Sequence, residues 1–140
     1  MRKLFLLLAM VVPGVCFGAD RWTALSMLES GDNDRAIGRA GEISRYQIMK
    51  AEWSSVTPSR RYTDPEMART VAAEVMNRRL AAFTQVRRRE PTNFEFYVLW
   101  NAPQQALQGR VTRRVAERAQ RFENLCALFS QPVRLYASRQ

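Results

Sequence analysis

Apolar side chains recur along most of this chain at intervals of three and four residues, the spacing of one face of an α-helix. The longest such segment opens with Thr63-Asp64-Pro65-Glu66, which combines a cap residue, a proline at the first helical position and an acid. A strongly apolar run that includes Tyr97 and Trp100 forms another. Helices are expected at about residues 20–30, 47–55, 63–86, 91–101 and 112–129, with a turn or short helix at 104–109.

A polar, glycine-containing segment interrupts the helical pattern after the first helix. Residues 32–41 alternate small and polar side chains and include Gly38 and Gly41. This alternation has no helical period and indicates a loop, with a small hairpin around residues 36–46. The expected fold class is therefore mainly α, a single domain with a small loop or β-hairpin beside the first helix.

The first helix ends on an acidic residue in an unusual position for a surface carboxylate. Trp22, Leu25 and Leu28 form the apolar face of this helix, and Glu29 lies at the edge of that face. Gly31 suits the position just after a helix, which puts Glu29 in the last turn. Apolar neighbours and the negative end of the helix dipole both favour the protonated carboxyl. Such a group can act as the general acid in glycoside cleavage, although a solvated helix-end glutamate is the simpler alternative.

Residues 1–19 have the organisation of a secretory signal peptide. Arg2 and Lys3 are basic, residues 4–17 are apolar, and small residues follow. We expect cleavage there and a periplasmic or secreted mature protein. A retained membrane anchor is the alternative, which the shortness of the apolar run disfavours. The expected domain covers residues 20–132, and a loose tail covers residues 133–140.

The composition excludes several kinds of chemistry. The chain has no histidine and two cysteines, of which only Cys126 lies outside the signal segment. His-based triads, His-ligated metals and cysteine-ligated zinc are therefore excluded, and we expect no metal and no cofactor. Glycoside cleavage needs only one or two carboxylates, which this chain can supply.

The chain is basic, and this charge bears on its partners. The formal net charge is +9, which falls to +7 when Arg2 and Lys3 leave with the signal peptide. A basic exported protein is attracted to polyanions such as cell-wall polymers, lipid surfaces or nucleic acids. The arginines are spread over several helices, and those on the polar face of the last one are Arg113, Arg114, Arg118 and Arg121. We therefore expect no specific nucleic-acid binding and no stable membrane span.

Three motifs, together and in order, carry a resemblance to a known family. They are Glu29-Ser30-Gly31, residues 40–48 (AGEISRYQI) and residues 99–103 (LWNAP). The first resembles the catalytic Glu-Ser motif of the lysozyme-like superfamily, closest to soluble lytic transglycosylases and goose-type lysozymes. The second is similar to that family's glycine-containing loop ending in Gln-Ile, and the third resembles its Ala-Tyr-Asn-Ala-Gly-Pro motif. The resemblance covers nearly all of the expected domain and implies a lysozyme-like fold.

The resemblance implies cleavage of the β-1,4 bond between N-acetylmuramic acid and N-acetylglucosamine in peptidoglycan. Glu29 would protonate the leaving oxygen and, in a transglycosylase, would then act as base while a 1,6-anhydro product forms. The implied partners are peptidoglycan glycan strands, with a cell-envelope machinery left open, and we expect a monomer. The implied substrate-binding residues are Ser30, Gln47 and Asn101, which would hold the substrate or orient Glu29, and Tyr46 and Trp100, which would offer flat faces to sugar rings.

Two departures from the family pattern leave alternatives open. Trp100 stands where the family has a tyrosine, so a hydroxyl is missing, and Tyr46 is a candidate replacement. This departure keeps open a non-catalytic peptidoglycan-binding module. Glu42 stands where many transglycosylases have a small apolar residue, whereas goose-type lysozymes carry an extra acid in this loop that places a water. As a second catalytic residue of a hydrolase, Glu42 would lie about 6.5–9.5 Å from the acid; otherwise it is a loop acid paired with Arg39 or Arg45.

Overall fold

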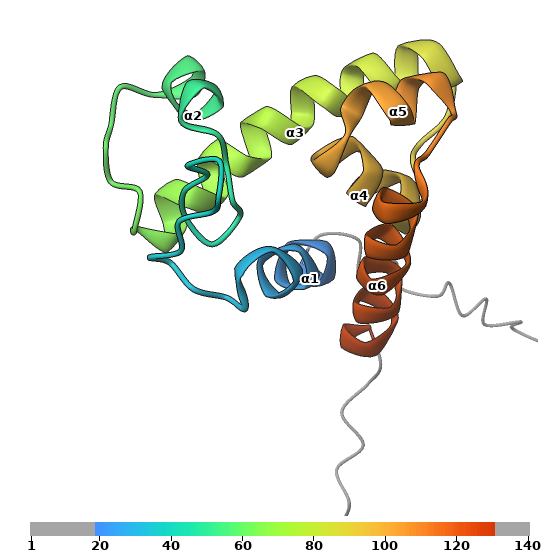
Figure 1. Ribbon diagram of the computed structural model, residues 1–140. Helices are drawn as coiled ribbons and strands as arrows, with labels where there is room; N and C mark the ends of the chain where they lie inside the picture. The colour runs from blue at the N-terminus through green and yellow to red at the C-terminus, as the bar shows by residue number, and fades with distance from the viewer. Residues whose placement is uncertain (1–18, 131–140) are drawn as a thin grey trace, which may run out of the picture.

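The computed structural model describes residues 19–130, which form a mainly helical fold (Figure 1). Within this range the chain has no regular strand, only isolated β-bridges. No helix in the described part combines the length and the apolar character that a membrane span requires. The helices are Ala19–Ser30 (α1), Lys50–Val56 (α2), Pro65–Arg87 (α3), Asn93–Asn101 (α4), Pro103–Gln108 (α5) and Arg113–Phe129 (α6).

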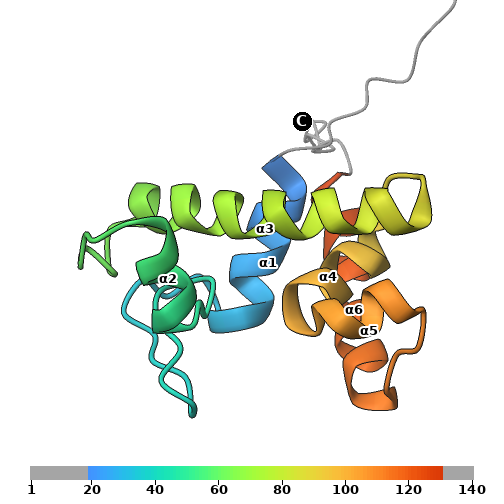
Figure 2. The same cartoon turned by 90° about the horizontal axis from the view of Figure 1, so that it is seen from above.

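Helix α3 runs along the whole width of the fold, and the other elements lie against its two halves (Figures 1 and 2). Helix α2 and the loop that follows α1 lie at one end of α3, and helices α4 and α5 pack at the other. Helix α4 also packs closely on α6, and α6 packs on α1. The arrangement leaves two groups of elements facing each other across the middle of α3, with α1 between them.

The helical pattern of the sequence predicts these elements closely. The capping signal before the long helix is confirmed, because the Asp64 carboxylate accepts a hydrogen bond from the Met67 N–H at 2.9 Å and Pro65 is the first helical residue. The predicted helix 47–55 is wrong at its start, since α2 begins only at Lys50. Gln47 adopts a left-handed φ of 52°, which ends the loop rather than opening a helix.

The polar segment after α1 forms a compact loop rather than a full hairpin. Ile43 forms bridges to both Ile37 and Ile48, with N···O distances of 2.9 Å in the two hydrogen bonds between Ile43 and Ile48. Ile43 and Ile48 are buried whereas Ile37 is 78% exposed, so the loop attaches to the core at its second half. The loop is therefore fixed where it approaches α1 and projects outward at its tip.

Aromatic side chains join the loop, α1 and α4 in the core. The Trp22 ring lies edge-on to Tyr46 (5.7 Å), Phe96 (5.9 Å) and Trp100 (6.4 Å between centroids). Phe96 in turn stacks on Phe122 of α6 at 5.7 Å. Edge-to-face and offset-stacked pairs of this kind add to the gain from burying the rings. The cluster therefore fixes the first turn of α1 against α4, α6 and the loop.

Two of the predicted segments lie largely outside the described residues. Residues 1–18 of the expected signal peptide and the expected tail at residues 133–140 belong to the part of the chain that the structure does not describe. Ala19, the last residue of the expected signal peptide, is the first residue of α1. Of the domain expected at residues 20–132, the structure describes residues 20–130.

The start of α4 is held by a capping box and an ion pair. Thr92 accepts from the Glu95 N–H at 3.2 Å, and the Glu95 carboxylate accepts from the Thr92 N–H at 3.0 Å. Arg89 donates to both oxygens of the same carboxylate at 2.6 and 2.7 Å. These interactions, with the Arg89 hydrogen bonds first, lower the pKa of Glu95 from 4.5 to about 2.

This lowered pKa predicts acid sensitivity of the fold. The unfolded chain binds the Glu95 proton more tightly, so the Glu95 contribution is present above pH 4.5 and is lost as pH falls toward 2. Glu95→Gln should reduce the free energy of unfolding at neutral pH, and its difference from the wild type should shrink across that window. Urea unfolding followed by circular dichroism at several pH values measures this difference. Glu117→Gln, which removes an exposed i,i+4 pair with Arg113, should change stability much less.

Candidate functional site

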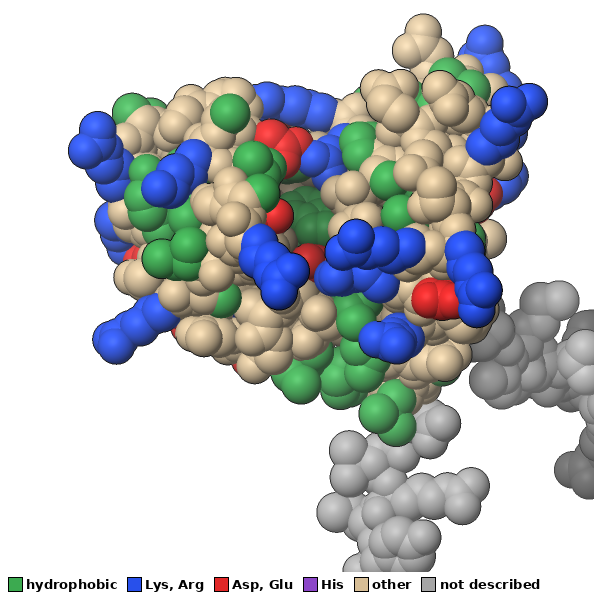
Figure 3. All heavy atoms as spheres, viewed as in Figure 1, with side chains coloured by type: hydrophobic (Ala, Val, Ile, Leu, Met, Phe, Trp, Pro, Cys, Tyr) green, Lys and Arg blue, Asp and Glu red, His purple; other side chains and the backbone are tan. Residues whose placement is uncertain are grey.

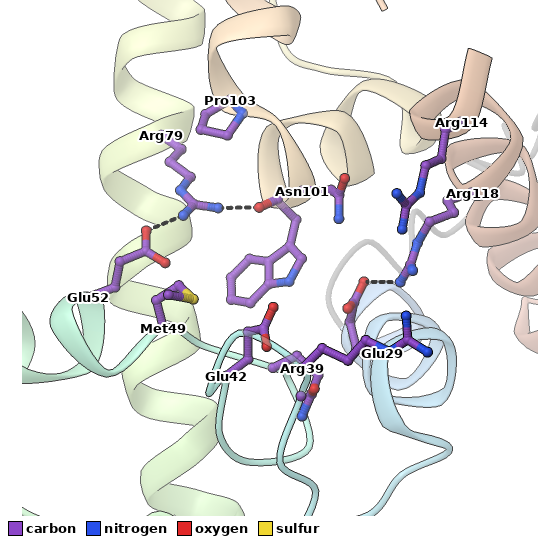
Figure 4. Close-up of a pocket in the computed structure, with 13 residues that line it drawn as sticks. Glu29, Arg39, Glu42, Met49, Glu52, Arg79, Asn101, Pro103, Arg114 and Arg118 are labelled. Carbon is purple, nitrogen blue, oxygen red and sulfur yellow. Dashed lines mark hydrogen bonds and ion pairs between the residues drawn. The ribbon is translucent and has the colours of Figure 1, made fainter. Parts of the chain in front are cut away.

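A cleft opens between the two groups of elements and has a volume of about 480 Å³. Figure 3 shows acidic and basic side chains gathered around a hollow in this face of the molecule. Every helix contributes to its lining, as does the loop after α1 (Figure 4). The lining residues are Glu29, Gly38, Arg39, Glu42, Gln47, Met49, Glu52, Arg79, Trp100, Asn101, Pro103, Arg114 and Arg118.

Glu29 projects from the last turn of α1 into this cleft. Its side chain is only 8% exposed, and its Oε1 atom accepts two hydrogen bonds from other helices. The Tyr97 hydroxyl of α4 donates at 2.7 Å, and Nη2 of Arg118 on α6 donates at 3.1 Å. Arg118 Nε also donates to the Tyr97 hydroxyl oxygen at 2.6 Å. Three helices therefore meet at one carboxylate oxygen.

The second oxygen of Glu29 has a different environment. Within residues 19–130, both hydrogen bonds to this carboxylate go to Oε1, and Oε2 has none. Every buried side-chain nitrogen or oxygen in that range has a hydrogen-bond partner, so Oε2 must be open to the cleft. A proton on Oε2 would leave both hydrogen bonds to Oε1 intact. The carboxyl group is thus held by one oxygen while the other can meet a ligand.

The Tyr97 hydroxyl contacts Glu29 at the site, and the sequence does not predict this contact. Burial first, and then the neighbouring Glu29 carboxylate, raise the pKa of Tyr97, so the hydroxyl stays protonated and donates. The pKa of Arg118 is also raised, because Glu29 and Tyr97 outweigh the opposing effect of burial. Neither residue is among the site residues that the sequence predicts. The helical pattern assigns Tyr97 to an apolar face, and the local signal is only that it is the one hydroxyl in the run from Phe94 to Trp100.

The loop forms the opposite wall of the cleft and carries Glu42 and Gln47. Glu42 Oε2 accepts from the Ala40 N–H at 2.9 Å, and Gln47 Nε2 donates to the Ser44 carbonyl at 3.0 Å. A Cβ atom at Gly38 would collide with the Glu42 carboxylate and would lie 2.6 Å from Gln47 Oε1, so glycine permits their close approach. The expected pairing of Glu42 with Arg39 or Arg45 is absent among the ion pairs of the described chain, where Arg45 pairs instead with two aspartates.

Arg79 of α3 holds the end of α4 at the back of the cleft. It donates to the backbone carbonyls of Leu99, at 3.1 Å, and Trp100, and it pairs with Glu52 of α2 (Figure 4). The last carbonyls of a helix have no partner within the helix, so this arginine satisfies groups that would otherwise need water. Trp100 is 7% exposed, whereas Asn101 is exposed, and both line the cleft.

Two of the predicted substrate-binding residues do not line this cleft. Ser30 donates to the Arg45 carbonyl at 2.8 Å and accepts from the Asn33 N–H at 3.0 Å, so it ties the end of α1 to the loop. Tyr46 is 4% exposed and packs on Trp22, in a separate hollow. The hydroxyl expected from Tyr46 is supplied to Glu29 by Tyr97 instead. The cleft therefore brings together Glu29, Glu42, Gln47, Trp100 and Asn101.

The described residues contain no group of three or more histidine, cysteine, aspartate or glutamate side chains arranged to hold a metal ion. Scans of family models, curated proteins and solved structures give no match to this chain. Inferences about function therefore rest on the chemistry of the cleft.

The Glu29–Tyr97–Arg118 contact predicts a coupled loss of stability. Tyr97→Phe keeps the ring but leaves Glu29 Oε1 and Arg118 Nε each short of one hydrogen bond, which should cost roughly 1–3 kcal/mol. Arg118→Gln should also destabilise, and the double variant should lose less than the sum of the two, because both act on one carboxylate. Urea unfolding of the four proteins measures the coupling. Tyr62→Phe is the control, since its hydroxyl has no hydrogen bond within residues 19–130; equal losses for both tyrosines would contradict the prediction.

Proposed function

We propose that this protein cleaves peptidoglycan at the β-1,4 bond between N-acetylmuramic acid and N-acetylglucosamine, in the manner of a lytic transglycosylase. The observation that carries this proposal is Glu29, a largely buried carboxyl that is held at Oε1 and open to the cleft at Oε2. A general acid must keep one oxygen free to reach the reacting atom. Glycoside cleavage uses such an acid and needs no histidine or metal.

In this proposal Glu29 Oε2 protonates the glycosidic oxygen of a sugar chain lying along the cleft. Tyr97 and Arg118 act as positioning residues, since they hold Oε1 and so fix the direction of Oε2. Once the bond breaks, Glu29 is a carboxylate, and Arg118 stabilises that charge at 3.1 Å. In a transglycosylase the carboxylate would then take the proton of the muramic 6-hydroxyl as this oxygen attacks C1, which gives a 1,6-anhydro product.

The walls of the cleft suit a polysaccharide. Trp100, which is 7% exposed, and the exposed Asn101 line the cleft from the end of α4, and Gln47 lines it from the loop. Flat rings and amides of this kind contact sugar faces and hydroxyl or N-acetyl groups. The three motifs that resemble those of the lysozyme-like superfamily all contribute residues to the cleft. The proposal therefore includes a lysozyme-like fold and an exported protein of the cell envelope.

The hydrolase alternative depends on Glu42, which lies on the wall facing Glu29. In the described chain the only hydrogen-bond partner of the Glu42 carboxylate is the Ala40 N–H on Oε2, so the other oxygen is available to a water. A water held there would attack the sugar and give a reducing end. This alternative concerns the product, and it keeps the same substrate and the same acid.

Glu29→Gln should abolish release of soluble products from purified peptidoglycan, because the amide cannot donate the acidic proton. The fold should persist, since an amide oxygen can still accept from Tyr97 and Arg118. Mass spectrometry of the soluble fraction measures turnover, and circular dichroism measures folding. Glu74→Gln, on the exposed side of α3, is the matched control and should retain activity. Wild-type turnover by Glu29→Gln would end the proposal.

The masses of the products separate the two chemistries. Products with 1,6-anhydromuramic ends are expected, and Glu42→Gln should then reduce turnover less than tenfold. Products heavier by one water would instead make the protein a hydrolase, and Glu42→Gln should then cost on the order of 100-fold or more, within the range for a catalytic base. Saturable binding without any soluble product would leave a peptidoglycan-binding module.

A further inference from the structure

The charges of the cleft are not balanced pair by pair. Arg118 pairs with Glu29, and Arg79 pairs with Glu52. Two further arginines line the same cleft, Arg39 from the loop and Arg114 from α6. Both are exposed, and within residues 19–130 neither makes an ion pair or a side-chain hydrogen bond.

Their positions distinguish these two arginines from others on the surface. Arg39 belongs to the loop wall and Arg114 to the α6 wall, so two available guanidinium groups flank the space into which Glu29 opens (Figure 4). The space-filling view shows basic side chains on both sides of the hollow (Figure 3). A concave site with low-dielectric walls strengthens the field of such charges compared with a convex surface. An anionic group entering the cleft would therefore meet a cation on either wall.

We propose that Arg39 and Arg114 form a recognition site for carboxylates carried by the glycan strand on either side of the bond that is cut. This inference rests on the proposed function, since peptidoglycan carries a carboxyl on the lactyl ether of each muramic residue or on the peptide attached to it. A guanidinium can bind a carboxylate through two parallel hydrogen bonds, which gives direction as well as strength. Neutral glycans would lack both interactions.

The charge of Glu29 is compensated within the cleft. Glu29 is paired with Arg118, and its acidic form carries no charge. Glu42 is the acid of the cleft that remains without a cation in the described chain, and it accepts the Ala40 N–H. Arg39 and Arg114 therefore outnumber the one unpaired acid. The carboxylates of the strand would lie over the cationic walls while the sugar rings lie on the cleft floor.

The test measures binding to three preparations of soluble glycan strands labelled at one end. The first keeps its peptides, the second has lost them to an amidase and exposes the lactyl carboxylates, and the third has all carboxyls converted to amides. Fluorescence anisotropy gives Kd for Glu29→Gln, a background in which cleavage does not interfere. In that background, a variant with both Arg39→Gln and Arg114→Gln is compared with a variant with both Arg60→Gln and Arg110→Gln. Arg60 and Arg110 are exposed and lie outside the cleft, so the two variants lose the same charge at different places.

Glu29→Gln should bind the strands with peptides about tenfold more tightly than the amidated strands, a difference in keeping with hydrogen bonds to charged groups. The Arg39 and Arg114 substitutions should remove this difference, and the Arg60 and Arg110 substitutions should keep it. Peptide-free strands that bind like the first preparation would assign the site to lactyl carboxylates; peptide-free strands that bind more weakly would assign it to the peptide carboxylates.

Two results would overturn this inference: equal binding of charged and amidated strands by Glu29→Gln, or equal losses for the two arginine pairs. Turnover of peptidoglycan by the wild-type protein is measured in parallel. Turnover without discrimination between strands would remove the carboxylate site and leave the proposed function. Discrimination without turnover would remove the cleavage reaction and keep the site in a binding module.

Discussion

Burial of the Glu29 carboxyl is the constraint on which the rest of the structure depends. A carboxylate removed from water is very costly unless hydrogen bonds or an opposite charge compensate for it. The compensation comes from Tyr97 and Arg118, which lie 68 and 89 residues further along the chain. Helices α4 and α6 must therefore pack correctly before Glu29 can be buried, and the contact of Phe96 with Phe122 is part of that packing. The site is assembled by the core rather than added to its surface.

The opposite wall depends on a second constraint, the close approach of backbone and side chains in the loop. The Asp32 and Asp34 carboxylates hold Arg45, and Ser26 donates to Asp32 at 2.7 Å, so the loop is attached to α1 at its base. Gly38 then leaves room for the Glu42 and Gln47 side chains. A loop stabilised only by surface ion pairs would be weakly held; this one also buries Ile43 and Ile48. The wall of α4 and α6 is thus held by hydrogen bonds to a buried carboxylate, whereas the loop wall is held by ion pairs and two buried isoleucines.

Much of this arrangement follows from sequence, because local patterns encode local structure. The helical spacing predicts α1, α3, α4 and α6, and Gly31 predicts the position of Glu29 at a helix end. Glu42, Gln47, Trp100 and Asn101, which the motif resemblance singles out, line the same cleft.

The partners of Glu29 could not be predicted in this way. Periodicity assigns Tyr97 to the core and Arg118 to a solvated face, and both assignments are partly correct, since Tyr97 is fully buried while Arg118 is 36% exposed. Their function lies in a contact between distant segments, which periodicity does not report. Tyr46 illustrates the converse: its place within a motif predicts a role at the site, but in the structure its ring packs against Trp22.

Helix α3 connects these two constraints. It contributes Arg79, which pairs with Glu52 of one wall and binds the carbonyls at the end of α4 in the other. The same guanidinium lies 5.3 Å from the centre of the Trp100 ring, so one side chain positions both an acid and an aromatic surface. The Arg79 side chain is only 15% exposed, so loss of its guanidinium would leave helix-end carbonyls short of a hydrogen bond. Helix α3 and one arginine therefore join the two walls of the cleft, which helps to hold a site drawn from every helix in one geometry.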